Sequence, residues 1–218
     1  MTTIAVIDYD MGNLHSACKG LEVAGATTLV TDSVADIESS DGVVLPGVGA
    51  FDPAMQHLRS RNLIDPIRRI AQSGKPFLGI CVGMQVLFEG CEEGIEAGLG
   101  IFPGTIRRFQ PEPGITIPHM GWNQLALSQP NLPLWKNIEP DTWVYFVHSY
   151  YAAPNDVALN AATITHGTQT VTAAVSKDNL MAVQFHPEKS SDAGLQILSN
   201  FVGYVKDQQM QAAQLVVA

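Results

Sequence analysis

The sequence predicts an α/β fold: a flavodoxin-like, doubly wound mixed sheet with a largely antiparallel C-terminal half. Over the first 90 residues, short apolar runs rich in β-branched residues alternate with stretches of helical periodicity, as in parallel strands joined by helices. Beyond Gly98, runs of strand-forming residues follow one another with short turns, which is typical of antiparallel strands. No internal repeat or linker is evident, so we expect one domain over residues 1–218 with a C-terminal tail at 206–218.

The first half is expected to begin with a β-α-β unit. Its strand runs are almost wholly apolar, as in strands that are buried on both faces of a parallel sheet. We expect strands at 3–8, 26–31, 42–45 and 76–80, and helices at 13–23, 53–73 and 81–88. The second of these helices contains Asn62 and Pro66, so we expect a break near both residues.

The second half is expected to contain six strands and a final helix. The strands are placed at 104–109, 116–127, 143–148, 158–165, 171–176 and 181–185. Asp192 is of a type that caps helices, and we expect it to start the final helix. The apolar face of that helix is predicted to consist of Leu195, Leu198, Val202 and Val205. Whether the tail after Lys206 continues the helix is left open.

Composition excludes several classes of function. A net charge of −9, from 21 acidic and 12 basic residues, argues against nucleic acid or an anionic membrane as a partner. Cys18, Cys81 and Cys91 show no paired spacing and no Cys/His ligand set, so we expect no disulfide framework, no metal site and no cofactor. The sequence has no basic leader and no apolar run of about 20 residues. These features favour a cytoplasmic protein.

The segment PFLGICVG, residues 76–83, is the strongest functional signal. A cysteine that ends an apolar run is, by itself, more often an inert buried residue than a nucleophile. Here Gly79 and Gly83 flank Cys81 with the spacing of a tight strand-turn-helix elbow. Such a turn would place the sulfur at a helix N-terminus, where the thiolate is favoured. The segment therefore predicts a cysteine nucleophile.

The segment FHPEKS supplies a base and an acid. His186 and Glu188 are expected at a strand end, where residues two apart leave the same face and Pro187 fixes the backbone between them. A structural pair would be the favoured interpretation if these residues stood alone. Together with Cys81 they provide a nucleophile, a base and a carboxylate that orients the base.

An acyl-transfer site also needs N–H groups that stabilise an oxyanion. The N–H of Val82 directly follows the cysteine. A second donor is expected from the PGVG loop, from the backbone of Gly47, Val48 or Gly49, because glycines allow close approach and unusual backbone angles. An ordinary glycine turn is the alternative for this loop.

Five segments, in this order, carry a resemblance to a known family: LPGVGAF, GICVGMQVLFE, PHMGWN, YFVHSYY and FHPEKS. Over about residues 3–205 the chain resembles class I glutamine amidotransferases, and among them the glutaminase subunits of imidazole glycerol phosphate synthases. The cysteine elbow and the HPE motif are general to the class. The PGVG, PHMGWN and HSYY segments narrow the resemblance to this group.

The resemblance implies a glutaminase. Cys81 would attack the side-chain amide of glutamine, His186 would move the thiol proton to the leaving ammonia, and Glu188 would hold the imidazole. Water would then hydrolyse the thioester to glutamate. The implied glutamine pocket contains Gln85, Glu93, His148, Ser149 and Tyr150. Glu93 would contact the ammonium group of glutamine, and the backbone of Ser149 and Tyr150 would contact its carboxylate. Without the resemblance, Glu93 would be interpreted as part of a solvated acidic run.

The resemblance also implies a partner. In this family a (β/α)8-barrel cyclase subunit forms a heterodimer with the glutaminase and uses the ammonia to make imidazole glycerol phosphate and aminoimidazole carboxamide ribotide, in histidine biosynthesis. The matching interface positions are His119, Met120, Gly121, Trp122, Asn123 and Lys189. A core aromatic is the alternative for Trp122. An amidotransferase for another acceptor and a non-catalytic regulatory module are the alternative functions.

Overall fold

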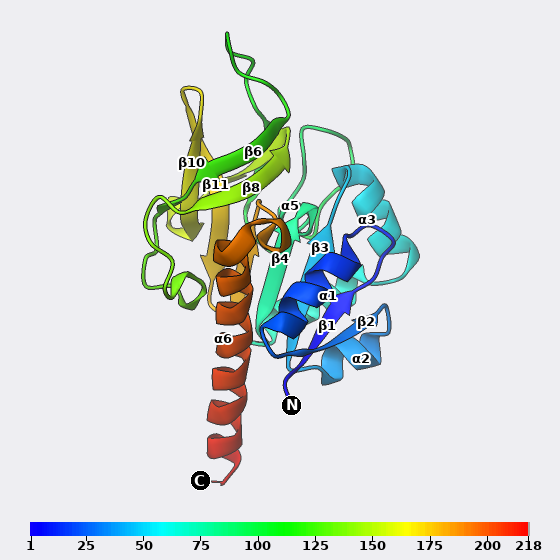
Figure 1. The fold of residues 1–218 in the computed structure, drawn as a ribbon. Helices are drawn as coiled ribbons and strands as arrows, with labels where there is room; N and C mark the ends of the chain where they lie inside the picture. The colour runs from blue at the N-terminus through cyan, green and yellow to red at the C-terminus, as the bar shows by residue number, and fades with distance from the viewer. Residues whose placement is uncertain (218) are drawn as a thin grey trace.

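The computed structural model describes residues 1–217, with side chains described up to residue 214. At its centre is a ten-stranded sheet in the order β2-β1-β3-β4-β12-β11-β10-β7, with β5 and β9 attached through β11, and helices pack against this sheet (Figure 1). The N-terminal elements are β1 (Thr3–Ile7), α1 (Leu14–Val23), β2 (Thr27–Thr31), α2 (Val34–Ser39), β3 (Gly42–Gly47), α3 (Phe51–Ser60), α4 (Ile64–Gln72), β4 (Phe77–Cys81) and α5 (Val82–Gln85).

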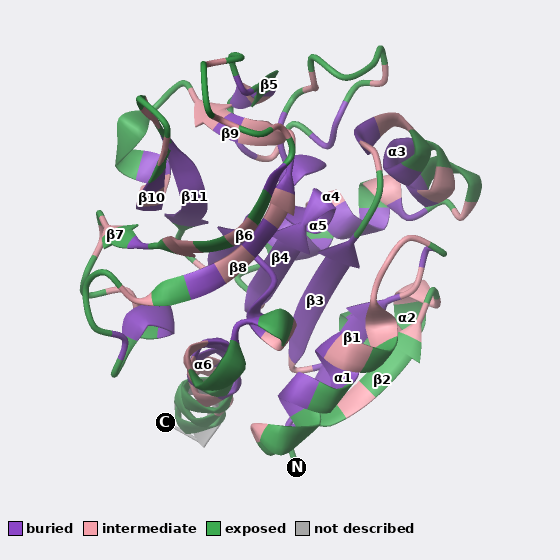
Figure 2. Ribbon diagram, turned by 45° about the horizontal axis from the view of Figure 1, so that its top comes forward, coloured by how far each residue is buried: buried purple, intermediate pink, exposed green. Residues whose placement is uncertain are grey.

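Strands β1 to β4 form the parallel half that the sequence predicts. β1 lies between β2 and β3, and β4 pairs with the other side of β3. Every residue of β3 and β4 is buried (Figure 2), which explains why these runs lack polar alternation. Because β3 and β4 are parallel and in register, their last residues, Gly47 and Cys81, are paired. The PGVG loop and the cysteine elbow therefore start from the same edge of the sheet.

Two expected helices have different bounds in the structure. The break near Asn62 is confirmed, because α3 ends at Ser60 and α4 begins at Ile64. Pro66 follows this break in the first turn of α4, where a missing N–H costs no intrahelical hydrogen bond. The helix expected to reach residue 88 ends at Gln85.

The early end of α5 has a physical cause in its carbonyl groups. The carbonyl of Val86 accepts the N–H of Leu99 at 2.8 Å, and that of Leu87 accepts the N–H of Ile101 at 2.8 Å. These long-range partners replace helical ones. A further short helix, α2, is absent from the prediction. Ser33 caps it by accepting the N–H of Asp36.

The C-terminal half is mainly antiparallel, as predicted. β12 joins the halves because it pairs parallel with β4 and antiparallel with β11. The elements are β5 (Gly104–Arg108), β6 (His119–Gln124), β7 (Ala126–Leu127), η1 (Pro133–Trp135), β8 (Trp143–His148), β9 (Tyr150–Pro154), η2 (Val157–Leu159), β10 (Asn160–His166), β11 (Gln169–Lys177), β12 (Leu180–Val183), η3 (Pro187–Lys189) and α6 (Ser191–Val217).

The strands of this half differ from the prediction in two places. The run 116–127 is not one strand. Its pairing begins at His119, and Leu125 divides it into β6 and β7. β6 pairs with β8 in a separate ribbon, whereas β7 pairs with β10. Strand β9 was not predicted. Only Ser149 separates β9 from β8, but β9 pairs with β5 and not with β8. Both differences arise where the chain changes its pairing partner within one or two residues.

The last helix, α6, is longer than the prediction and buries a different set of side chains. It continues to Val217, and Asp192 lies in its first turn rather than at its cap. Its buried apolar residues are Ile197, Leu198, Phe201, Val202 and Val205, whereas Leu195 is 38% exposed. α1 and α6 lie on the same face of the sheet (Figure 1), and Gly20 permits their contact, since a Cβ there would lie 2.5 Å from Leu198.

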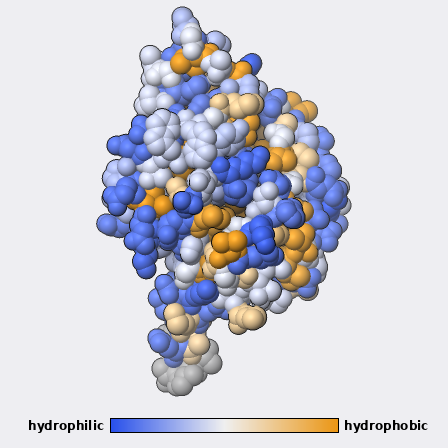
Figure 3. Space-filling view, viewed as in Figure 1, coloured by the Kyte–Doolittle hydropathy of each residue, from blue (hydrophilic) through white to orange (hydrophobic). Residues whose placement is uncertain are grey.

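No helix among residues 1–217 is long and apolar enough to cross a lipid bilayer. On the face seen in Figure 3, hydrophobic side chains form small patches among hydrophilic ones. The three cysteines are free thiols.

Candidate active site

Cys81 occupies a strained elbow between β4 and α5. Its φ of 56° lies in the left-handed region, which is costly for a residue with a side chain and is found mostly at functional sites. Gly83 allows α5 to lie directly on β3, because a Cβ there would be 1.8 Å from the carbonyl oxygen of Leu45. Gly47 faces the same contact: its Cβ would lie 2.5 Å from the nitrogen of Gly83. Close packing of α5 therefore holds the elbow.

His186 and Glu188 meet beside this elbow, although not on a strand end as expected. β12 ends at Val183; His186 caps the 3₁₀ turn η3, which begins at Pro187 and contains Glu188. The turn brings their side chains together, with Nδ1 of His186 2.7 Å from Oε1 of Glu188 and each side chain only 3% exposed. Ser190 fixes the turn by donating its hydroxyl to the carbonyl of His186 at 2.7 Å.

The charge state of His186 depends on its two neighbours. Burial by itself would lower the pKa of His186, but a hydrogen bond with Cys81 and the hydrogen bond with Glu188 outweigh it and raise the pKa to about 10. The imidazole is thus held in its protonated form beside the sulfur at neutral pH. Gln184 also contacts the sulfur, with Nε2 3.6 Å from Sγ of Cys81.

A cavity of about 160 Å³ opens next to Cys81. It is lined by Gly49, Cys81, Val82, Gln85, Glu93, Pro118, Val147, His148, Ser149 and Tyr150. The structure therefore brings the whole predicted glutamine pocket together around the sulfur. Pro118 and Val147 were missed by the sequence analysis, although each directly precedes a predicted site residue.

Two side chains of the cavity are fixed by hydrogen bonds from distant elements. Nε2 of Gln85 donates to the carbonyl of Tyr150 at 3.3 Å and to Oε1 of Gln184 at 3.0 Å. Oε2 of Glu93 accepts the N–H of Phe51 at 2.9 Å, at the N-terminus of α3, where a carboxylate is favoured. Glu93 is thus exposed but held in place, unlike a freely solvated acidic residue. Gln184 is a further residue of the site that was missed; a polar residue between Val183 and Phe185 was its signal.

The predicted oxyanion donors differ in their hydrogen bonds. Val82 is the first residue of α5, and N–H groups at that position have no partner within the helix. The N–H of Val48 donates to the carbonyl of Met11 at 3.3 Å, so in this conformation it does not serve an oxyanion at Cys81. Gly49 has a φ of 89° and lines the cavity.

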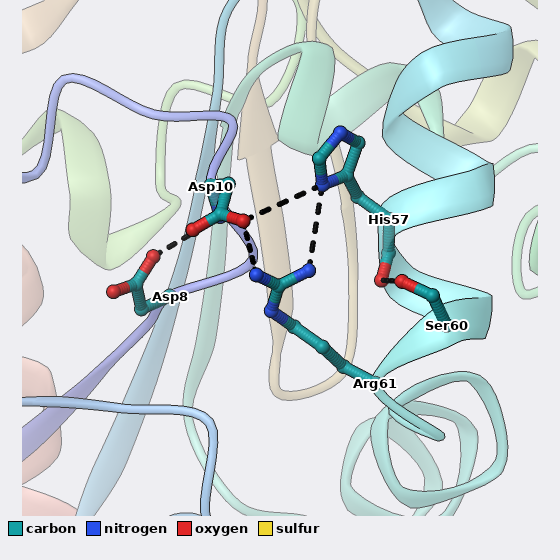
Figure 4. Close-up of polar contacts among 5 residues, drawn as sticks. All are labelled: Asp8, Asp10, His57, Ser60 and Arg61. Carbon is teal, nitrogen blue, oxygen red and sulfur yellow. Dashed lines mark hydrogen bonds and ion pairs between the residues drawn. The ribbon is translucent and has the colours of Figure 1, made fainter.

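The loop that carries Met11 is itself tied down by a surface cluster (Figure 4). Asp10 forms an ion pair with Arg61 and lies 3.8 Å from Nδ1 of His57. Its N–H also bonds to the carboxylate of Asp8 at 3.1 Å. Residues from the end of α3 and just beyond it therefore hold the loop in which Met11 engages Val48.

The predicted interface residues lie mostly on the β6–β8 ribbon. Met120 and Trp122 are 64% and 47% exposed, which excludes the core alternative for Trp122. Lys189 is also exposed, on η3 next to Glu188. Gly121 and Asn123 are partly buried between these positions. His119 is buried instead, with only 6% exposure, because alternate residues of a strand point to opposite faces.

Comparisons with known proteins identify the family of this chain. The family model "Glutamine amidotransferase class-I" matches residues 5–204. A protein of Acaryochloris marina is 71% identical over 94% of this chain and 96% of its own length, and one of Cyanothece is 69% identical over 94% and 98%. Both are described as "Imidazole glycerol phosphate synthase subunit HisH".

Solved structures show the same fold at low sequence identity. PurLQS from Thermotoga maritima matches 94% of this chain and 99% of its own, with a TM-score of 0.71 and 20% identity. A structure described as glutamine amidotransferase matches 91% and 98%, with a TM-score of 0.69 and 15% identity. The fold prediction and the family resemblance are both confirmed. This chain belongs to the class-I glutamine amidotransferase family, and within it to the HisH subunits of imidazole glycerol phosphate synthase.

Proposed function

We propose that Cys81, His186 and Glu188 hydrolyse glutamine in the cavity beside Cys81, and that the ammonia passes to a cyclase subunit in a cytoplasmic heterodimer. One observation carries this proposal: two segments far apart in the sequence bring a thiol, an imidazole and a carboxylate together, and the thiol lines the cavity.

The reaction follows from this arrangement. The sulfur of Cys81 forms a bond to the amide carbon of glutamine while His186 holds the thiol proton, and the carbonyl oxygen becomes an oxyanion near the Val82 N–H. When the oxyanion collapses, the carbon–nitrogen bond breaks and His186 gives its proton to the leaving ammonia. Water then attacks the thioester with His186 as the base, and glutamate and the free thiol are formed.

Glu188 keeps the imidazole in place through both steps, because its Oε1 accepts from Nδ1 and leaves Nε2 as the atom that exchanges protons. At the other end of the substrate, Glu93 has the charge to pair with the ammonium group. The backbone of Ser149 and Tyr150 lies on the cavity wall, where it can replace the water lost by the carboxylate.

The partner is proposed from the surface beside the site. Ammonia that escapes into neutral water is protonated and lost as a nucleophile, so a second active site must lie close by. Met120, Trp122 and Lys189 are exposed side chains near the pocket, and aromatic residues and Met are enriched in interfaces. The cyclase would use the ammonia to make imidazole glycerol phosphate and aminoimidazole carboxamide ribotide.

The test is to measure glutamate release by the isolated chain, then with its cyclase and the nucleotide ligand of the cyclase. We expect weak hydrolysis alone and strong stimulation by the liganded partner, because Val48 in this conformation donates to Met11. Full turnover without the partner would contradict the coupled function.

A substitution separates the two reactions. Cys81→Ala should abolish glutamate release yet keep synthesis by the complex when ammonia is supplied in solution. Cys18→Ala, in α1 outside the cavity, is the matched control and should keep both activities. Glutamate release by the Cys81→Ala complex would reject the proposed nucleophile.

A further inference from the structure

Two buried histidines lie behind the β6–β8 ribbon. His119 and His148 are directly opposite each other in the register of β6 and β8, and each is only 6% exposed. Their rings pack against Phe109 and Phe146, and His166 stacks on His119 with ring centroids 4.3 Å apart. Polar groups in such an apolar setting need hydrogen-bond partners. The contacts of these rings therefore decide whether each ring is neutral and which of its nitrogens carries the hydrogen.

The two rings form one chain of hydrogen bonds between the cavity and the ribbon. Nδ1 of His148 lies 2.8 Å from the carbonyl oxygen of Tyr150, and Nε2 of His148 lies 3.3 Å from Nδ1 of His119. Nε2 of His119 lies 3.4 Å from Nδ2 of Asn123. The same Asn123 nitrogen donates to the carbonyl of Thr165 at 3.0 Å.

Hydrogen-bond chemistry fixes the direction of this chain. A carbonyl oxygen only accepts, so Nδ1 of His148 must carry the hydrogen, and Nε2 of the neutral ring must then accept. Nδ1 of His119 is therefore a donor and its Nε2 an acceptor, which matches the amide NH₂ of Asn123. Every link is satisfied only if both rings are neutral with the hydrogen on Nδ1.

The surroundings favour these neutral rings. The pKa of His148 is lowered to about 3: burial is the main cause, the bond to Tyr150 opposes it, and the nearby His119, His166 and His186 add to the lowering. Burial and then His166 lower the pKa of His119 to about 4. No acidic side chain forms a hydrogen bond or an ion pair with either ring among the described residues.

The two ends of this chain of hydrogen bonds, Tyr150 and Asn123, lie at different functional surfaces. Tyr150 lines the cavity, and its carbonyl also accepts Nε2 of Gln85 at 3.3 Å. Two donors therefore set the direction of this carbonyl. Asn123 lies on β6 next to the exposed Trp122, in the ribbon that is proposed to meet the cyclase. A change at the ribbon can thus reach the cavity through two rings.

We propose that His148 and His119 are positioning residues for glutamine: as two neutral, hydrogen-bonded rings they fix the Tyr150 segment of the pocket and connect it to Asn123 on the ribbon. The role of His148 in the pocket is thus carried by its side chain. This inference rests on the proposed function of the cavity.

A pair of substitutions tests which nitrogen matters. The amide of His148→Asn occupies the place of Nδ1 and can still donate to Tyr150, whereas the amide of His148→Gln occupies the place of Nε2 and cannot. In complex with the liganded cyclase, we expect His148→Gln to raise the KM for glutamine about tenfold, as loss of one buried hydrogen bond implies, with kcat changed less than about threefold. The rise in KM for His148→Asn should be at least threefold smaller.

A purely structural role would give a different result. Equal KM values for the two variants, or a loss confined to kcat, would overturn the positioning role. If either variant fails to fold, as judged by its thermal transition, the second test below decides the question.

The second test does not depend on glutamine hydrolysis. Nitrogen-15 NMR of the imidazoles in the isolated chain at pH 7 should show His119 and His148 neutral with the hydrogen on Nδ1. Asn123→Asp replaces the donor at Nε2 of His119 by an acceptor, so it should shift the hydrogen to Nε2 or protonate the ring. Gln124→Glu, the next residue of β6, adds the same charge and should leave both rings unchanged.

These outcomes separate the two proposals. A hydrogen on Nε2 of either ring in the unsubstituted protein would overturn the proposed chain of hydrogen bonds. Equal effects of Asn123→Asp and Gln124→Glu would overturn it as well. A complex that releases no glutamate while both rings keep the Nδ1 hydrogen would reject the proposed hydrolysis, and with it the role in glutamine binding, but not the hydrogen-bonded chain.

Discussion

Nδ1 of His186 lies 2.7 Å from Oε1 of Glu188 in a buried turn, so the carboxylate helps hold a charged imidazole beside the sulfur of Cys81. Glu188→Gln keeps the shape but removes the charge. We expect the pKa of His186 to fall from about 10 towards its ordinary value, and kcat to fall by about 10²-fold or more. The loss should remain smaller than that of Cys81→Ala. A pH–rate profile of the complex measures both effects, and a loss as large as that of Cys81→Ala would contradict the orienting role.

Gly83 is expected to be intolerant of any side chain. In Gly83→Ala the Cβ would lie 1.8 Å from the carbonyl oxygen of Leu45, so α5 must move away from β3 and take Cys81 with it. We expect a loss of about 2–3 kcal/mol in the free energy of unfolding, a size typical of overpacking, together with loss of glutamate release. Urea unfolding and the glutaminase assay measure the two effects.

Gly203→Ala is the matched control for this substitution. Gly203 lies within α6, and a Cβ there meets no atom within 4 Å. Alanine favours a helix over glycine by up to about 1 kcal/mol, so this variant should be equally or more stable and fully active. If both variants behaved alike, the packing of α5 on β3 would not be the cause.

The stability of the fold should depend on pH through His119. Its pKa is lowered to about 4 in the folded chain, so between about pH 6.5 and 4 the unfolded chain binds a proton that the folded chain does not. The free energy of unfolding must therefore fall as pH drops through this window. At pH 5 we expect His119 to account for about 1–2 kcal/mol of the fall.

His119→Phe removes this proton and should reduce the dependence of the free energy of unfolding on pH between 7 and 5, although His148, whose pKa is lowered to about 3, still contributes a slope of the same sign. The exposed His15→Gln is the control for loss of a histidine. Urea unfolding at several pH values gives the slopes. An unchanged slope for His119→Phe would show that His119 is not the group responsible.

The ion pair of Asp10 and Arg61 is expected to limit hydrolysis by the isolated chain. It holds the loop in which the carbonyl of Met11 accepts the N–H of Val48. Arg61→Gln should loosen the loop and let the Val48 N–H turn towards Cys81. Since a surface ion pair contributes at most about 1 kcal/mol, we expect no more than about a fivefold rise in partner-free glutamate release.

Arg69→Gln is the control for this effect. Arg69 forms a surface ion pair with Glu38 at 3.2 Å, away from the loop, and its loss should leave the rate unchanged. The measurement is the initial rate of glutamate release at saturating glutamine without the cyclase. No rise for Arg61→Gln, or the same rise for both variants, would contradict a role for the cluster in Figure 4.

The parallel half of the fold was readable from the sequence because its information is local. Strands such as β3 and β4 are buried at every residue, so each appears as an unbroken apolar run, and the helices between them have their own periodicity. In open α/β sheets, sites lie beyond the carboxyl ends of the strands, and Gly47 and Cys81 lie at those ends of β3 and β4. The strand break at Leu125 and the strand β9 were not readable, because they depend on which distant strand each segment meets.

The candidate site divides in the same way. The glycine spacing around Cys81 and the proximity of His186 to Glu188 are short-range features, so the sequence indicated both, although the pair lies on a turn and not on a strand. The direction of the Val48 N–H and the hydrogen bond from Gln184 to Cys81 are set by residues many positions away. No local pattern encodes them.

The length of α6 provides an attachment point for measuring how the chain binds a cyclase. Its 27 residues span about 40 Å, and its C-terminal end lies at the opposite end of the molecule from the β6–β8 ribbon (Figure 1). A fluorophore or a surface tether attached there would sit far from the docking ribbon and from the glutamine cavity. Tethered through that end, the chain would present its ribbon outward to a cyclase in solution.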